Sequence, residues 1–205
     1  MDQGGVAAHL PNSGRMEELL VPGRSVVLAE CPAIHRKTRF DMLLVRYQGR
    51  WVSVDSRLPS ALAAEALRQR ALPAWERYGE VRREVTWGDS RFDLELRDGA
   101  HRCLVETKSV NLVEDGRALF PDAPTTRGVR HVRTLIEAVR AGLEAGVLFV
   151  IQREDAEVLS PFDAADPDFG RALREATAAG VTVLAYRCRV TPERITLGAP
   201  VPVEL

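Results

Sequence analysis

The first part of the chain alternates short apolar runs with turns that contain Gly and Pro. The runs Ser25–Glu30 and Thr38–Tyr47 have the composition and length of β-strands. The turn at Gln48–Arg50, followed by Trp51–Asp55, indicates a hairpin. Three or four strands suit a small β-barrel but are few for closing one. We therefore expect a β-rich N-terminal domain over residues 1–57.

Beyond this point helices alternate with longer strands, which indicates a mixed α/β domain over residues 58–205. Ser60 is a favourable N-cap residue at its start. The expected elements, in chain order, are a helix over Ala61–Leu72, strands over Val81–Trp87, Arg91–Leu96 and Cys103–Val110, a helix over Thr126–Leu143, a buried strand over Val147–Gln152, a helix that Asp166 opens and Gly180 closes, and strands over Val181–Val190 and Arg194–Leu197.

Charged residues sit among the apolar positions of two consecutive strands. Asp93 alternates with apolar residues on one strand, and on the next Glu106 and Lys108 are two apart, so they share a face. If the strands are neighbours, the three side chains converge. Two carboxylates that lie close together repel each other unless a cation lies between them. Mg²⁺ or Mn²⁺ is held by such carboxylates together with water and phosphate oxygens.

A lysine beside such an ion orients or deprotonates a metal-bound water and stabilises negative charge on phosphorus. On a helical wheel Glu65 lies among apolar residues, so it would supply a third carboxylate from the preceding helix. The expected catalytic residues are therefore Asp93, Glu106 and Lys108, and the expected metal ligands are Glu65, Asp93 and Glu106. The alternative is a solvated strand face, where the same residue types are common.

The amino-acid composition limits the kinds of protein that this chain can be. The chain has 28 basic and 29 acidic residues, a net charge of −1, and only two lysines, Lys37 and Lys108. Any basic surface must therefore be local. The three cysteines form no CxxC pair, which argues against a disulfide framework and a cysteine zinc site. Without an apolar run of about 20 residues or a signal peptide, we expect a cytoplasmic protein that does not enter membranes.

A basic helix begins within the run FPDAPTTRGVRH. Thr125 or Thr126 is suited to cap it, and the N-terminus of a helix attracts phosphate. Arg127, Arg130 and His131 lie in its first turns, beside the strand that carries Glu106 and Lys108. We expect these three residues to contact nucleic-acid phosphates, with His131 a phosphate contact rather than a metal ligand. The alternative is a solvated helix face.

The order of elements resembles the core of the PD-(D/E)xK nuclease-like fold. More narrowly, the chain resembles the sugar fermentation stimulation protein (SfsA) family in the runs HLPNSGRM, RKT, LPSALAAEAL, SRFDLEL, CLVETKSVNL, FPDAPTTRGVRH, VLFVIQR and PVPVEL. This resemblance implies a DNA-binding protein with an N-terminal OB-like barrel, a C-terminal PD-(D/E)xK domain and a role in regulating sugar (maltose) utilisation. The nuclease motif then maps onto Asp93, Glu106 and Lys108, with Glu65 as the helical acid.

Members of that family normally carry further residues before this start, so the first barrel strands are expected to be missing, most simply through a misplaced gene start. Leu10 also stands where the family usually has Cys, and Ser60 where it often has Asn. An OB-like barrel binds single strands with basic side chains and stacking aromatic rings. The candidates in the first domain are Arg15, Arg36, Lys37, Arg39 and Trp51, although Trp51 is equally suited to fill the barrel.

Three functions follow from these features. The first is a DNA-binding regulator of sugar genes that carries a divalent-metal site of nuclease type. The second is an active Mg²⁺- or Mn²⁺-dependent nuclease on DNA or RNA, which the acid, acid and lysine set favours. The third is a phosphodiesterase for a small nucleotide or phosphosugar, which the near-neutral charge permits. Nucleic acid, most simply DNA, is the expected partner, and the sequence does not indicate an oligomeric state.

Overall fold

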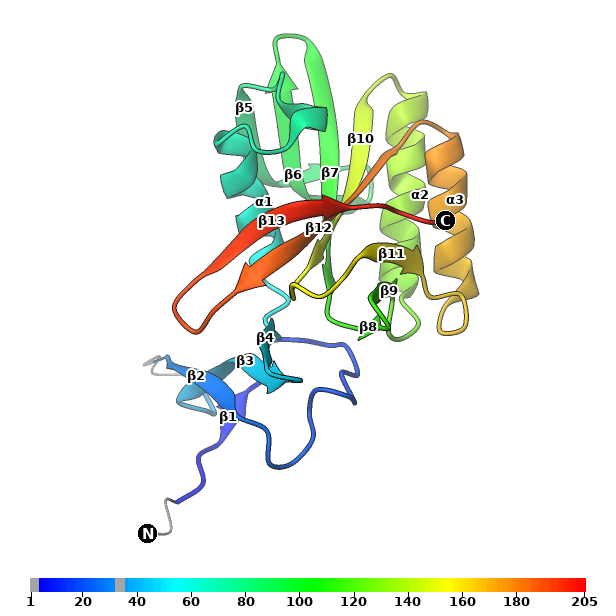
Figure 1. The fold of residues 1–205 in the computed structure, drawn as a ribbon. Coiled ribbons are helices and arrows are strands. Elements are labelled where there is room, and N and C mark those ends of the chain that lie inside the picture. Colours follow the sequence, from blue (N-terminus) through cyan, green and yellow to red (C-terminus); the bar gives the residue numbers. More distant parts are fainter. Residues whose placement is uncertain (1–3, 32–35) are drawn as a thin grey trace.

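The computed structural model describes residues 4–31 and 36–205, with a small N-terminal sheet next to a larger α/β domain (Figure 1). The N-terminal strands are β1 (Ala8–His9), β2 (Val26–Glu30), β3 (Phe40–Tyr47) and β4 (Arg50–Ser53). Strand β3 pairs with the other three, antiparallel to β2 and β4 and parallel to β1. The expected hairpin is confirmed. Within the described residues the strands form an open sheet and do not close into a barrel.

The larger domain contains the expected helices and strands close to their expected bounds. They are α1 (Leu58–Arg68), β5 (Glu80–Trp87), β6 (Ser90–Asp98), β7 (His101–Val110), α2 (Thr126–Arg140), β10 (Glu144–Ile151), α3 (Pro167–Ala178), β12 (Thr182–Val190) and β13 (Ile195–Val201). The pattern did not predict the 3₁₀ turn η1 (Pro73–Trp75) or the short strands β8 (Val113–Glu114), β9 (Arg117–Phe120) and β11 (Val158–Pro161), which pair with one another. Elements this short carry too few residues for a periodic signal.

A six-stranded sheet in the order β13-β12-β10-β7-β6-β5 divides this domain into two cores. Strands β7, β10 and β12 are parallel, and the outer pairs are antiparallel. Helices α2 and α3 cover one face, where Leu135 and Phe169 pack with Phe149 of β10 (Figure 1). Helix α1 covers the other face, where its Leu67 packs with Leu148. Because both faces are covered, β10 is buried along nearly its whole length, as the continuous apolar run predicted.

The two domains meet at the carboxyl ends of β7 and β10. Gln152, which is fully buried directly after β10, accepts a hydrogen bond from Ser53 Oγ (2.8 Å) and donates to Asp55 O (3.0 Å) and Ser109 Oγ (2.8 Å). The Ser53 N–H also donates to Gln152 O (3.0 Å), and Asn111 of the segment after β7 donates to Ser53 O. These buried hydrogen bonds fix the end of β4 to the carboxyl ends of β7 and β10 in the large sheet.

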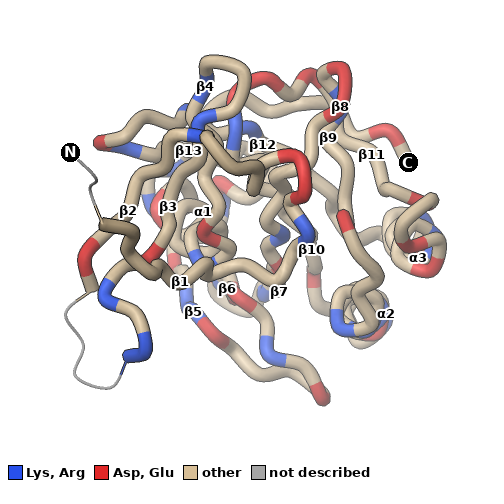
Figure 2. The backbone as a smooth tube through the Cα atoms, turned by 90° about the horizontal axis from the view of Figure 1, so that it is seen from below, with Lys and Arg blue, Asp and Glu red and all other residues tan. Residues whose placement is uncertain are grey.

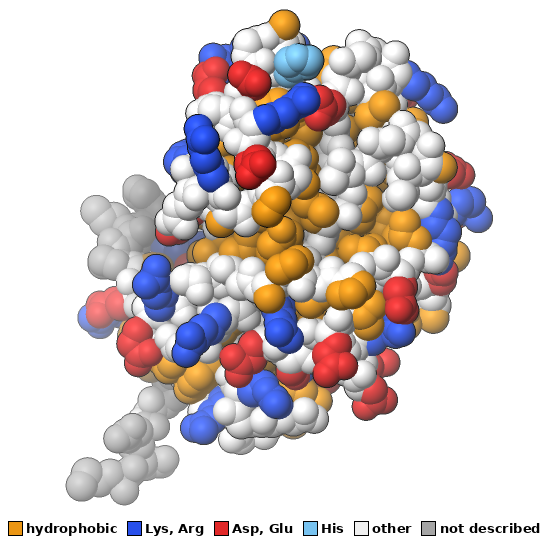
Figure 3. All heavy atoms as spheres, turned by 45° about the horizontal axis from the view of Figure 1, so that its top comes forward, with side chains coloured by type: hydrophobic (Ala, Val, Ile, Leu, Met, Phe, Trp, Pro, Cys, Tyr) orange, Lys and Arg blue, Asp and Glu red, His pale blue; other side chains and the backbone are white. Residues whose placement is uncertain are grey.

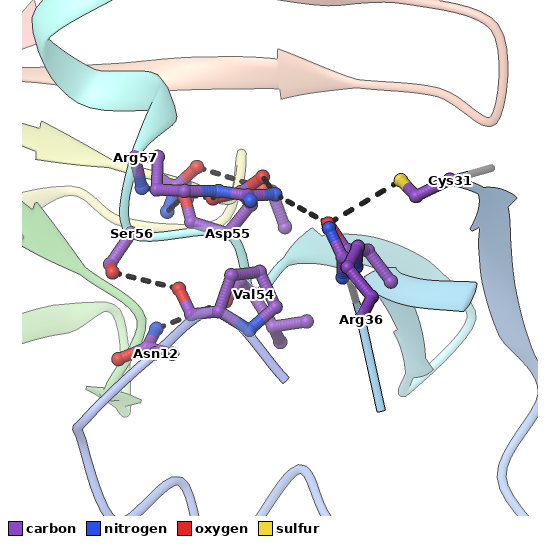
Figure 4. Close-up of polar contacts among 11 residues, drawn as sticks. Asn12, Cys31, Arg36, Val54, Asp55, Ser56 and Arg57 are labelled. Carbon is purple, nitrogen blue, oxygen red and sulfur yellow. Dashed lines mark hydrogen bonds and ion pairs between the residues drawn. The ribbon is translucent and has the colours of Figure 1, made fainter. Parts of the chain in front are cut away.

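A second set of bonds holds the N-terminal loop to the linker that joins the domains (Figure 4). Asn12 Nδ2 donates to Val54 O (3.1 Å), and Ser56 Oγ donates to Pro11 O (2.8 Å). On the far side of the loop, Asp122 Oδ2 accepts a hydrogen bond from the Arg15 N–H (2.9 Å). These contacts place the loop at residues 12–15 next to the carboxyl end of β7. In the described parts of the chain, no helix is long and apolar enough to cross a membrane.

We expect Gln152→Ala to lower the free energy of unfolding by about 2–3 kcal/mol, because it leaves buried partners in both domains without hydrogen bonds. Urea denaturation measures this change. The matched control is Gln69→Ala, whose amide is exposed and donates only to Glu65 (3.1 Å), so we expect a change within about 0.5 kcal/mol. Equal stability of the two variants would contradict a structural role for the buried junction.

Candidate functional site

A cleft of about 680 Å³ opens at the carboxyl end of β7, between the two domains. The N-terminal ends of α1 and α2, the loop at residues 12–14 and the segment 119–125 form its walls. Asp93, Glu106 and Lys108 all line it, so the structure brings together the three residues that the strand pattern predicted. In α/β sheets, the carboxyl ends of parallel strands are the usual position of a ligand site.

Asp93 lies where β6 separates from β7. The ladder between the two strands runs from Asp98↔His101 to Leu94↔Val105. Asp93 Oδ2 then accepts hydrogen bonds from Thr107 N (2.8 Å) and Thr107 Oγ1 (2.5 Å), so the carboxylate takes the place of a backbone acceptor. The alternation expected along β6 fails here. Phe92 belongs to the core under α2, whereas Leu94 faces α1.

Glu106 is the most enclosed acid of the cleft, with 5% of its surface exposed. Its Oε1 accepts hydrogen bonds from Lys108 Nζ (2.7 Å) and from His131 Nδ1 (2.6 Å). Its Oε2 is buried and has no hydrogen-bond partner among the described residues. A buried polar atom without a partner is rare in proteins, and at this position it is an open ligand for a cation or a water.

The two carboxylates respond differently to their surroundings. Burial works against ionisation of Glu106, but the charge of Lys108 and the bond from His131 outweigh it and lower the pKa of Glu106. Burial, and then the charge of Glu106, raise the pKa of Asp93, and the bonds from Thr107 offset this only in part. A nearby cation would therefore favour the ionised form of Asp93.

The donor set fits a hard divalent cation. Asp93 and Glu106 supply carboxylate oxygens, one of which is buried and unpartnered, and their mutual repulsion falls when a cation lies between them. No cluster of three or more His, Cys, Asp or Glu side chains suited to a metal occurs in residues 4–31 and 36–205. Two carboxylates completed by water and substrate oxygens are the arrangement that Mg²⁺ commonly uses.

The expectation for Glu65 is wrong. Its side chain is exposed on α1 and accepts a hydrogen bond from Gln69 (3.1 Å), and it does not line the cleft. The buried residues of α1 are instead Pro59, Leu62, Ala63, Ala64, Ala66 and Leu67. The apolar stripe is therefore rotated from the one that the helical wheel selected. The expected helix extended to Leu72, whereas α1 ends at Arg68, so Leu72 does not lie on the helix beside Glu65.

His131 is also placed differently from the expectation. Only 2% of its surface is exposed, so it is buried under the cleft rather than facing a phosphate backbone. Its Nδ1 donates to Glu106, and its Nε2 accepts from Arg127 Nε (3.4 Å), which fixes the tautomer. His131 therefore orients Glu106 from α2. The helical spacing of Arg127 and His131 was visible in the sequence, but the strand that His131 faces was not.

The other expected nucleic-acid contacts divide between the cleft and the outer surface. Arg127 is exposed and lines the cleft at the N-terminus of α2, where Thr125 Oγ1 accepts from Gly128 N (3.0 Å) as the helix cap. Arg130 is exposed on the same helix outside the cleft. Arg15 and Lys37 are exposed, and neither lines the cleft.

Three N-terminal candidates are engaged away from the cleft. Arg36 forms an ion pair with the buried Asp41, and Arg39 pairs with Glu30 (2.5 Å). Trp51 is half-buried and packs against the core under α1, so it serves as a packing residue. The structure therefore does not gather Arg36, Arg39 and Trp51 at the cleft.

Arg57 is a cleft residue that the sequence reasoning missed. It precedes α1 and is held by Asp55 (2.7 Å) and by Asp41 (3.0 Å) of the N-terminal sheet (Figure 4). The bonds to Asp55 and then to Asp41 raise its pKa, so the guanidinium is always charged. The cleft is also lined by Ser60, Arg83 and Glu84, which the sequence did not indicate as site residues. Charge pairing between residues far apart in the chain leaves no periodic signal in the sequence.

Charges of both signs are interspersed over the molecule. Lys and Arg alternate with Asp and Glu along the backbone (Figure 2), and Figure 3 shows both signs around a central band of hydrophobic side chains. This agrees with the net charge of −1. Any attraction of an anionic ligand must therefore come from local groups such as Lys108, Arg127 and the helix N-terminus.

The chain is similar to known proteins over nearly its whole length. The family model described as "Sugar fermentation stimulation protein RE domain" matches residues 57–194, and the one described as "SfsA N-terminal OB domain" matches residues 1–54. A sugar fermentation stimulation protein homolog of Chloroflexus aurantiacus is 48% identical over 198 residues, which are 97% of this chain and 76% of that protein. The homolog of Moorella thermoacetica is 48% identical over 204 residues, 98% of this chain and 87% of the relative.

A solved structure is also similar to this chain over its whole length. The structure of Pyrococcus furiosus SfsA in complex with Ca²⁺ matches with a TM-score of 0.91 and 29% sequence identity, over 100% of this chain and 88% of that chain. The expected fold class is confirmed, with an N-terminal OB domain followed by a mixed α and β domain.

We expect Asp93→Asn to stabilise the protein in EDTA, because it removes a half-buried charge next to Glu106 while an amide oxygen can still accept from Thr107. A gain of about 1 kcal/mol would raise the Tm by about 2–4 °C in a chain of this size. Because burial raises the pKa of Asp93 in the native state, wild type loses stability relative to the variant as pH rises from the ordinary carboxyl pKa through the native value.

Below both pKa values the Asp93 carboxyl is neutral in the folded and unfolded states, and this pH-dependent difference in stability between wild type and variant disappears. Thermal unfolding between pH 3 and 8 measures it. The control is Asp98→Asn at the exposed end of the same strand, which should leave the Tm unchanged. An Asp93→Asn variant less stable than wild type at neutral pH would show that the charge of Asp93 is favourable in the native state.

Proposed function

This chain belongs to the sugar fermentation stimulation protein (SfsA) family, and on that basis we propose that it binds DNA and hydrolyses phosphodiester bonds at a Mg²⁺ or Mn²⁺ site in its second domain. The observation that carries the proposal is the arrangement of Asp93, Glu106 and Lys108 in one cleft, with Glu106 Oε2 buried and unpartnered. A protein that acts only by occupying DNA needs no such set. An effect on sugar utilisation would then be a consequence of nucleic-acid processing.

Asp93 and Glu106 would hold the cation, which when bound polarises a phosphoryl oxygen and lowers the pKa of bound water. Lys108 lies against Glu106 and carries the positive charge that stabilises a phosphorus centre as negative charge builds on its oxygens. His131 fixes the orientation of Glu106 from below. Arg127 and the N-terminus of α2 would bind a phosphate beside this centre.

A relative supports the choice of ligand. The Pyrococcus furiosus SfsA structure is described as a complex with Ca²⁺, a cation that takes oxygen ligands as Mg²⁺ and Mn²⁺ do. The proposal for this chain rests on its own donor set and takes that complex as support. A cytoplasmic location is part of the proposal, since DNA is the substrate.

We expect Lys108→Ala to reduce metal-dependent cleavage at least 100-fold while changing DNA affinity by less than about threefold, because the ammonium acts on the transition state. Wild type, Lys108→Ala and Asp93→Ala are compared on single- and double-stranded DNA and RNA with Mg²⁺, Mn²⁺ or EDTA. Lys37→Ala, which changes an exposed lysine outside the cleft, should keep the wild-type turnover at saturating substrate.

Metal-dependent cutting that both cleft variants lose would establish the nuclease. A wild type that binds DNA tightly without cutting it would contradict the hydrolytic part and leave a DNA-binding protein on a nuclease scaffold. Cutting of mononucleotide esters or phosphosugars alone, with binding insensitive to salt, would favour the small-substrate phosphodiesterase instead.

We also expect Arg127→Ala with Arg130→Ala to weaken DNA binding about tenfold at low salt and to reduce the salt dependence by one or two phosphate contacts. Arg127→Ala should cause most of the loss, because only Arg127 lines the cleft. The control is Arg140→Ala, an exposed arginine at the other end of α2. Fluorescence anisotropy at several salt concentrations measures the affinities, and unchanged affinity in the double variant would remove this helix from the interface.

A further inference from the structure

Helix α1 begins with a positive residue where helices usually have a hydrogen-bond acceptor. Arg57 occupies the N-cap position, and its side chain makes no capping hydrogen bond. Ser, Thr, Asp and Asn are preferred at this position because their oxygens accept from the first N–H groups of the helix, whereas a guanidinium has only donors. A positive charge at the positive end of the helix dipole is also unfavourable. An anion bound at this end of the cleft would offset both effects.

Two nearly buried carboxylates hold Arg57 in place (Figure 4). Its Nε donates to Asp55 Oδ1 (2.8 Å), and its Nη2 donates to Asp55 Oδ2 (2.7 Å) and to Asp41 Oδ2 (3.0 Å). The side chains of Asp55 and Asp41 are 6% and 2% exposed, whereas that of Arg57 is 54% exposed. Among the described residues these bonds use only Nε and Nη2, so Nη1 keeps its donors for a ligand in the cleft.

A second arginine reaches the same end of α1 from strand β5. Arg83 is exposed, and its Nη2 donates to Ser60 Oγ (3.1 Å) in the first turn of the helix. Glu84, the next residue of the strand, pairs with Arg91 (3.9 Å) instead. Within residues 4–31 and 36–205 no ion pair offsets the charge of Arg83. Arg57, Ser60 and Arg83 all line the cleft.

This end of the cleft therefore has more positive than negative charge. Asp41 is shared between Arg57 and Arg36, and Asp55 pairs with Arg57. With Arg83 added, three guanidinium groups face two carboxylates, and the helix dipole adds to this excess. The chain as a whole carries a net charge of −1, so the excess is a local property of this end of the cleft.

The two basic ends of the cleft lie on opposite sides of the large sheet. Helix α1 covers one face, with Arg57 and Arg83 at its N-terminus, and α2 covers the other face, with Arg127 at its N-terminus. Strand β7, which carries Glu106 and Lys108, lies in the sheet between them. A ligand that meets both ends must pass the two carboxylates and needs negative charge on each side of them. A nucleic-acid strand meets this requirement, because it has a phosphate at every step.

We infer that Arg57 and Arg83 form a second phosphate-binding subsite, which holds the backbone of a nucleic-acid strand beyond the phosphate at Lys108. This inference rests on the proposed function and narrows its substrate to a polynucleotide rather than a mononucleotide ester or a phosphosugar. The planar donors of a guanidinium match two oxygens of one phosphate. Asp41 and Asp55 are positioning residues that keep Arg57 directed into the cleft.

The test is competition binding to the full chain in EDTA, where metal-dependent cleavage does not occur. A fluorescent single-stranded oligonucleotide is displaced by an unlabelled decanucleotide, which has several phosphates, or by a dinucleotide, which has only one. We expect Arg83→Ala to weaken decanucleotide binding about fivefold and to reduce its salt dependence by about one phosphate contact. Dinucleotide binding should change less than about twofold.

Arg82→Ala is the matched control, because Arg82 is an exposed arginine on the same strand, paired with Glu80 (2.6 Å), and does not line the cleft. It should bind the decanucleotide as wild type does. Arg57→Lys tests the other arginine without leaving Asp41 and Asp55 unpaired, since it keeps the charge and loses the planar fork. We expect it to bind the decanucleotide about threefold more weakly, and wild-type affinity would remove Arg57 from the subsite.

Unchanged decanucleotide affinity in Arg83→Ala, or an equal loss in Arg82→Ala, would overturn the inference, while binding that still depends on Arg127 would uphold the proposed function. An equal loss of dinucleotide and decanucleotide binding would also overturn it, because the subsite would then take a lone phosphate. A wild type that binds no oligonucleotide, with EDTA or with Mg²⁺, would overturn the proposed function and the inference with it.

Discussion

The structure depends on one requirement, that the polar groups buried between the two domains must satisfy one another. Gln152 ends the central strand β10 and is fully buried, so its amide has only protein atoms to bond with. Those atoms come from Ser53 and Asp55 on one side and Ser109 on the other. Since these bonds are directional, they fix the orientation of the N-terminal sheet as well as its contact with the large one.

This orientation builds the cleft. With the end of β4 fixed to β10, the loop at residues 12–15 lies against the carboxyl end of β7, and Asp122 holds its far side. Arg57 enters the cleft from the linker with its guanidinium held by acids of the N-terminal domain. The candidate site is therefore a product of both domains, although its carboxylates and lysine all come from the second.

Three residues that line this cleft have unfavourable features. Burial and the charge of Glu106 raise the pKa of Asp93, Glu106 Oε2 has no partner among the described residues, and Glu84 holds a left-handed backbone within a strand. At the proposed metal site, a bound cation would favour the ionised form of Asp93 and give Glu106 Oε2 a partner. The bond from His131, by contrast, lowers the pKa of Glu106 and keeps that carboxylate ionised.

The sequence alone determined what depends on neighbours along the chain. Periodicity located the strands of the large sheet, and the two-residue spacing of Glu106 and Lys108 placed both in the cleft, because alternation along a strand is a local property. The tertiary structure decided what depends on distant partners. It turned Glu65 outward, buried His131 against Glu106 and placed Glu84 opposite Asp93. The rotation of a helix on a sheet and the register between strands are set by packing and hydrogen bonds between segments far apart in the chain, and no local pattern records them.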